Sequence, residues 1–124
     1  MLKMFIISVE RRFRASHQLI LPDGSKEPVH NHDWVVIAEV GSEKLNNIGV
    51  VMNFQKLQAM IDEIVAGFSN KPLETVGYFQ QNNPSAENVS KYIYEKLQVG
   101  LAEGVELRSV RVVEEPGCSA TYQK

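Results

Sequence analysis

The three histidines of this chain, His17, His30 and His32, fall within one short stretch. Residues two apart in a β-strand project to the same face, so His30 and His32 would point together if their stretch is a strand. If the preceding stretch pairs with it as an antiparallel hairpin, His17 comes alongside as a third nitrogen ligand. Three protein ligands with a fourth position open are typical of a catalytic zinc site.

The histidine spacing by itself leaves two alternatives open. Each histidine could instead lie on the surface of the sheet or form a hydrogen bond in the core, which is the ordinary role of an isolated histidine pair. A third histidine on the neighbouring strand favours the metal site. Imidazole nitrogens also bind copper, iron and nickel, so the spacing does not identify the metal.

Two stretches rich in β-branched and aromatic residues predict the strands that carry these histidines. The first runs from Met4 towards His17 and ends at the turn of residues 22–24. The second covers residues 29–41. We expect the two strands to be antiparallel.

Downstream, the sequence predicts two helices and then two more strands. Apolar residues at three-and-four spacing indicate the helices, and β-branched residues indicate the strands. The expected bounds are 54–68 for the first helix, Ser85 to Gly100 or Gly104 for the second, 105–113 for the next strand, and a final strand through Thr121 and Tyr122. The order ββααββ predicts an α+β fold, an antiparallel sheet with two helices on one face.

Length and composition limit the classes of function. A chain of 124 residues, 44% of them hydrophobic, predicts a single domain over residues 1–124. The formal charge of -2 leaves no excess of basic surface for a phosphate backbone, so nucleic acid is not an expected partner. The apolar run from Met1 to Val9 is too short to span a bilayer, so no membrane association is expected.

Cys118 is the only cysteine, so no intrachain disulfide can form. This fits a reducing compartment, and we expect a cytoplasmic protein in which Cys118 is a small buried hydrophobe. Long apolar strands in a small protein also leave open sheet edges. Because closing several subunits' sheets into one barrel would pair those edges, we expect a homo-oligomer.

Several motifs resemble those of the 6-pyruvoyl-tetrahydropterin synthase and 6-carboxytetrahydropterin synthase family. Residues 13–19 and 30–32 are similar to its phenylalanine-x-alanine-x-histidine-x-leucine and histidine-glycine-histidine motifs. Residues 49–54 resemble its glycine-to-aspartate-phenylalanine turn, 84–88 its proline-threonine-x-glutamate-asparagine helix start, and 110–114 its final strand. In order and spacing the resemblance covers nearly the whole chain.

The resemblance implies a tunnelling fold, in which three subunits close a twelve-stranded barrel and two trimers stack into a hexamer. It implies that His17, His30 and His32 hold Zn²⁺, which binds the hydroxylated side chain of a dihydropterin. It also implies that Glu114 anchors the pterin ring, since a carboxylate can accept two parallel hydrogen bonds from a ring N–H and an amino group. Without the resemblance, Glu114 would be interpreted as a solvated strand-end residue beside Glu115.

The sequence departs from the family pattern at the residues that move protons. Synthases carry a cysteine base before the first histidine of the pair, but residues 22–29 contain none, and Lys26 stands at the usual catalytic position. The family's aspartate-histidine pair aligns with Ser69-Asn70. The middle glycine of the metal motif is Asn31, and the aspartate of the glycine turn is Asn53.

Glu27 offers a substitute base, because it lies three residues before His30. This spacing resembles a family branch that uses glutamate in place of cysteine and cleaves the dihydroneopterin side chain by a retro-aldol step, releasing hydroxymethyl-dihydropterin. A carboxylate near zinc can accept a proton from a metal-bound hydroxyl. The alternative is that Glu27 is a solvent-exposed loop residue beside Lys26 with no role in catalysis.

Three hypotheses of function follow. The first is a zinc-dependent lyase that acts on the side chain of 7,8-dihydroneopterin or its triphosphate. The second is a homologue that binds zinc and a pterin without turnover. The third is metal storage or a structural oligomer without a pterin. This hypothesis does not explain why Glu114 matches the pterin-binding glutamate of the family.

Overall fold

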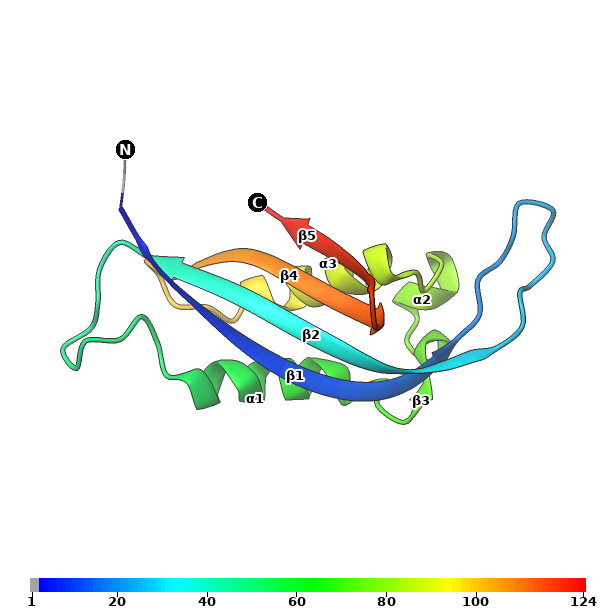
Figure 1. Cartoon of the computed structure of the whole chain (residues 1–124), viewed down its shortest axis with the longest axis horizontal. Helices are drawn as coiled ribbons and strands as arrows, with labels where there is room; N and C mark the ends of the chain where they lie inside the picture. The colour runs from blue at the N-terminus through cyan, green and yellow to red at the C-terminus, as the bar shows by residue number, and fades with distance from the viewer. Residues whose placement is uncertain (1–2) are drawn as a thin grey trace.

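The computed structural model describes residues 3–124, and in it the helices lie against one face of a strongly curved sheet (Figure 1). The sheet has five strands in the order β3-β1-β2-β4-β5. The elements are β1 (Phe5–His17), β2 (His30–Ser42), α1 (Phe54–Val65), β3 (Lys71–Pro72), the 3-10 turn η1 (Leu73–Thr75), α2 (Tyr78–Gln81), α3 (Ala86–Gln98), β4 (Glu106–Glu115) and β5 (Cys118–Gln123). The predicted α+β class and the four main strands are confirmed.

Between the two long helices the structure contains three short elements that the sequence pattern did not predict. β3 is only two residues long and pairs in parallel with residues 15–16 of β1. The turn η1 and helix α2 have three and four residues, which is too short for a periodic apolar pattern. The helix predicted over 54–68 ends at Val65, and Phe68 is buried from the turn that follows α1.

Strands β1 and β2 pair along their whole length in one antiparallel register. Alternate residues of β1 are buried against the helices, among them Phe13, Ala15 and His17. The matching face of β2 carries Trp34 and Val36, both fully buried. The histidines therefore lie at the end of the same sheet face that forms the core.

The core lies between this sheet face and helices α1 and α3. Each long helix contributes a stripe of buried apolar residues, as its three-and-four spacing predicts. These residues are Leu57, Ile61 and Val65 on α1, and Val89, Ile93 and Leu97 on α3. Both helices begin at a side-chain cap, since Asn53 accepts from the Lys56 N–H and Ser85 accepts from the Asn88 N–H.

The prediction that Cys118 is buried is wrong for this chain. Cys118 is exposed, because it begins β5, which is the last strand at one edge of the sheet. Among residues 3–124, no helix has the length and apolar character needed to cross a membrane.

Candidate metal centre

The three histidines lie together at the end of the β1–β2 hairpin. The register pairs His17 directly with His30, and it pairs Ala15 with His32. The ring centroids of His17 and His32 are 5.1 Å apart, those of His17 and His30 6.0 Å, and those of His30 and His32 5.9 Å. Imidazoles around a tetrahedral ion, with metal–nitrogen bonds of about 2.1 Å, have centroids about 5 Å apart. The spacing of the three rings is therefore close to that of imidazoles that bind one ion.

His17 is buried, and one of its ring nitrogens has a fixed partner. Its Nδ1 lies 2.8 Å from the backbone oxygen of Pro84, just before α3. Because a carbonyl oxygen only accepts, Nδ1 must carry the proton, and in the neutral ring Nε2 keeps its lone pair. A hydrogen bond from the far nitrogen to a backbone carbonyl is the usual way in which a metal-binding histidine is oriented.

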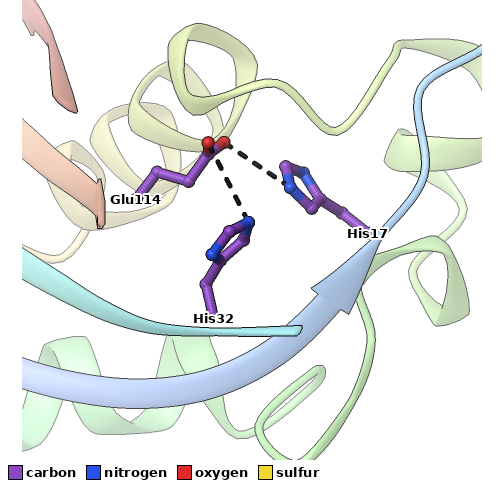
Figure 2. Close-up of side chains that lie close together, drawn as sticks. All are labelled: His17, His32 and Glu114. Carbon is purple, nitrogen blue, oxygen red and sulfur yellow. Dashed lines mark ion pairs between the residues drawn. The ribbon is translucent and has the colours of Figure 1, made fainter. Parts of the chain in front are cut away.

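Glu114, at the end of β4, faces the same point as the two inner histidines. Figure 2 shows its carboxylate facing the rings of His17 and His32, with Oε1 3.5 Å from His17 Nε2 and Oε2 3.9 Å from His32 Nε2. One ligand atom from each of the three residues lies within 4.8 Å of the others. The lone pair of His17 Nε2 and the carboxylate both accept, so a cation between them would satisfy both groups.

His30 is the outer member of the cluster. Its side chain is 45% exposed, and its Nε2 lies 4.0 Å from Oε1 of Glu27. Within residues 3–124 the converging set of ligand atoms comprises His17, His32 and Glu114. The rings of the three predicted histidines thus lie near one another. The ligand atoms that converge on one point, however, come from His17, His32 and Glu114, and not from His30.

Trp34 packs against the rings of the two inner histidines. Its ring meets those of His17 and His32 edge to face, with centroids 5.1 and 5.8 Å apart, and it is stacked on Phe13 at 5.8 Å. Its indole N–H donates to the Ala15 carbonyl at 3.1 Å. Sequence reasoning missed this residue, although its place two residues after His32 on the same strand face was a usable signal.

Glu27 is held close to the histidines by the loop that joins β1 and β2. Its Oε1 accepts from the Leu19 N–H at 3.1 Å, its backbone oxygen accepts from the Gln18 amide at 2.8 Å, and its side chain is 24% exposed. The loop therefore brings this carboxylate near His30. Its role as a base stays a prediction.

Ser69 and Asn70, which align with the family's aspartate-histidine pair, follow α1. Asn70 adopts a left-handed conformation with φ of 62°, and its N–H donates to the Arg14 carbonyl at 2.6 Å. Together with Ser16 and Asn31 it lines a hollow. Because Ser16 and Asn31 alternate with the inward-facing histidines, this hollow lies on the opposite face of the sheet.

Comparison with known proteins identifies the family. The sequence model of one protein family, described as 6-pyruvoyl tetrahydropterin synthase, matches residues 6–124. The chain belongs to this family. It is 30% identical over 125 residues to the 6-carboxy-5,6,7,8-tetrahydropterin synthase of Synechocystis sp., covering 96% of this chain and 93% of that protein.

Two further comparisons bear on the length and the fold of the chain. The chain is 26% identical over 102 residues to the dihydroneopterin monophosphate aldolase of Pyrococcus furiosus, covering 82% of each. The solved structure of Caenorhabditis elegans 6-pyruvoyl tetrahydropterin synthase matches with a TM-score of 0.87 and 21% identity, over 99% of this chain and 97% of that one. The subunit fold is therefore the tunnelling fold that the motifs implied.

We predict that protein purified without chelator holds about one metal ion per chain, and that His32→Ala loses most of it. The side chain of His32 is only 15% exposed and offers a nitrogen to the converging set, so a shortened side chain leaves an unfilled position. His30→Ala should also lower the occupancy. Elemental analysis by mass spectrometry measures both.

Asn31→Ala is the matched control, because Asn31 lies between the two histidines on the opposite face of the strand. Its metal content should equal that of the parent. Full occupancy in both histidine variants would show that the metal binds elsewhere.

Proposed function

We propose that this chain is a zinc-dependent lyase that cleaves the side chain of 7,8-dihydroneopterin or its triphosphate, with Glu27 as the base. Its membership in the 6-pyruvoyl tetrahydropterin synthase family supports a lyase of pterin biosynthesis. The observation that carries the finer proposal is the grouping of the three histidine rings, with Glu114 facing two of them and Glu27 beside the third.

The metal in this proposal is Zn²⁺, held by His17, His30 and His32. Imidazole nitrogens suit zinc, and three protein ligands leave a position for substrate. Bound there, zinc would act as a Lewis acid on an oxygen of the pterin side chain. The Pro84 carbonyl supports the assignment, because it leaves Nε2 of His17 as the free ligand atom.

Glu27 accepts the proton in the proposed step. In a retro-aldol cleavage the proton leaves the hydroxyl on C2′ while the C1′–C2′ bond breaks. C2′ becomes a carbonyl carbon, the electron pair passes from C1′ into the dihydropterin ring, and a proton returned to C1′ gives hydroxymethyl-dihydropterin. General-base help of this kind is typically worth about 10²- to 10⁴-fold. The relative from P. furiosus, named as an aldolase, supports this route.

Glu114 anchors the pterin ring in this proposal. Its two oxygens can accept paired hydrogen bonds from a ring N–H and an amino group. Its distances of 3.5 and 3.9 Å from the histidine nitrogens also make it a candidate fourth ligand. The two roles predict different losses when the charge of Glu114 is removed. A ring anchor loses affinity for the pterin, whereas a metal ligand loses zinc.

The alternative is a homologue that binds zinc and a pterin without turnover. One observation favours it: Asn70 lies on the sheet face opposite the histidines, so within this chain it supplies no proton relay to them. Ser69-Asn70 also lacks the aspartate and histidine of the family pattern.

We predict that Glu27→Gln lowers turnover of 7,8-dihydroneopterin on the order of 10²-fold or more, while the zinc content stays unchanged. The amide keeps the shape of the side chain and removes the base. Chromatography of the products after incubation measures the rate, and the triphosphate is assayed in parallel. Asp23→Asn, which neutralises a carboxylate at the turn of the same loop, is the control and should leave the rate intact.

Equal rates for Glu27→Gln and the parent would remove Glu27 from the mechanism. A parent that binds a pterin but converts neither dihydroneopterin nor its triphosphate would favour the binding homologue.

We predict that Glu114→Gln retains zinc but loses most of its affinity for the pterin. A carboxamide presents an N–H₂ group where the ring offers donors, so one of the paired hydrogen bonds becomes a clash of donors. Fluorescence titration with the pterin and elemental analysis separate the two roles. Loss of zinc in this variant would make Glu114 a metal ligand instead.

The proposal includes a homo-oligomer, and we predict a trimer or a hexamer in solution. In this chain β5 forms one open edge of the sheet, and β3 covers only residues 15–16 of β1 at the other. Open edges of this length are normally paired or protected. Native mass spectrometry at micromolar concentration measures the mass, and a monomer would contradict the barrel.

A further inference from the structure

The loop of residues 18–29 depends on a small number of hydrogen bonds for its position. Inside the loop, Leu19 and Glu27 are joined through backbone and side chain, and Gln18 also bonds to Glu27. Residues 21–25 close a tight turn of their own. These bonds hold the loop to itself, but they do not fix it against the rest of the subunit.

Asn83 supplies that link. Its Oδ1 accepts from the Ile20 N–H at 2.8 Å, and its Nδ2 donates to the Ile20 carbonyl at 3.0 Å, so one side chain satisfies both backbone groups of Ile20. Within residues 3–124, no other hydrogen bond outside the strand ladders joins the loop to the body of the subunit. Ile20 directly follows Leu19, whose N–H bonds the Glu27 carboxylate.

Asn83 is itself fixed to the start of α3. Its carbonyl accepts from the Asn88 side-chain amide at 2.8 Å, and the Asn88 N–H donates to the Ser85 cap at 3.1 Å. The next carbonyl along the chain, that of Pro84, accepts from His17 Nδ1. Two adjacent residues therefore hold the two parts of the site, Pro84 the inner histidine and Asn83 the loop that carries Glu27.

We propose that Asn83 is a positioning residue, which holds Glu27 at its working distance from the histidines. The proposal rests on the proposed function, in which Glu27 is the base. A long connecting loop is mobile unless it is tied down, and a displacement of about 1 Å in a reacting group can cost about 10²-fold in rate. Loss of the Asn83 amide frees the loop but leaves the contact between Pro84 and His17 in place.

The test compares Asn83→Ala with Asn82→Ala. Asn82 is the matched control, because its exposed amide also donates to a backbone carbonyl, that of Tyr78, and makes no bond to the loop. Asn83→Ala should lower kcat for 7,8-dihydroneopterin about 10- to 10²-fold, with zinc content and KM near those of the parent. Asn82→Ala should match the parent in all three.

The combination of Asn83→Ala with Glu27→Gln separates positioning from a general loss of stability. If Asn83 acts through Glu27, the double variant should be no slower than Glu27→Gln alone. Hydrogen exchange measured by mass spectrometry should show faster exchange of residues 18–29 in Asn83→Ala and unchanged exchange in α3.

Three results would overturn the inference while leaving Glu27 as the base. The first is a kcat of Asn83→Ala equal to that of the parent. The second is a double variant whose loss of rate is the product of the two single losses, and the third is a loss of zinc in Asn83→Ala. A full rate in Glu27→Gln would instead overturn the proposed base, and the positioning role with it.

Discussion

The antiparallel register of β1 and β2 is the constraint on which the rest of the site depends. It places His17 opposite His30 and Ala15 opposite His32, with all three histidines on the face that carries Trp34. Because side chains alternate with a period of two, a slip of one residue would turn the histidine pair to the opposite face of the sheet. The same slip would expose the apolar residues of the core, so the packing of the core and the geometry of the candidate metal centre are specified together.

The junction before α3 completes what the register begins. His17 is a buried polar side chain, and an unpaired polar group in such a place costs about 1–3 kcal/mol. The Pro84 carbonyl satisfies Nδ1 and thereby leaves Nε2 to face Glu114. Ser85 and Asn88 hold this junction through the first turn of α3. A helix start distant in sequence from the hairpin thus sets the tautomer of a candidate ligand.

The departures from the family pattern have different consequences in the structure. Asn53 caps α1 as an aspartate would, so that replacement leaves the local fold intact. Asn31 occupies the face of β2 opposite the histidines, so its side chain does not crowd the candidate metal centre. Glu27 is brought near His30, whereas Asn70 lies on the other side of the sheet. In the proposed function, the chemistry of the site therefore depends most on Glu27.

The sequence by itself determined the class of fold, the four main strands, the two long helices and the family, because periodic apolar patterns and histidine spacing are local properties of the chain. It also indicated the three histidines, since alternation along a strand is fixed by backbone geometry. Only the tertiary structure decided that Glu114 converges with His17 and His32, that Pro84 and Asn83 hold the two parts of the site, and that Cys118 is exposed. These contacts join residues from β4, α3 and the hairpin, and their geometry follows from how the helices pack on the sheet, which no local pattern records.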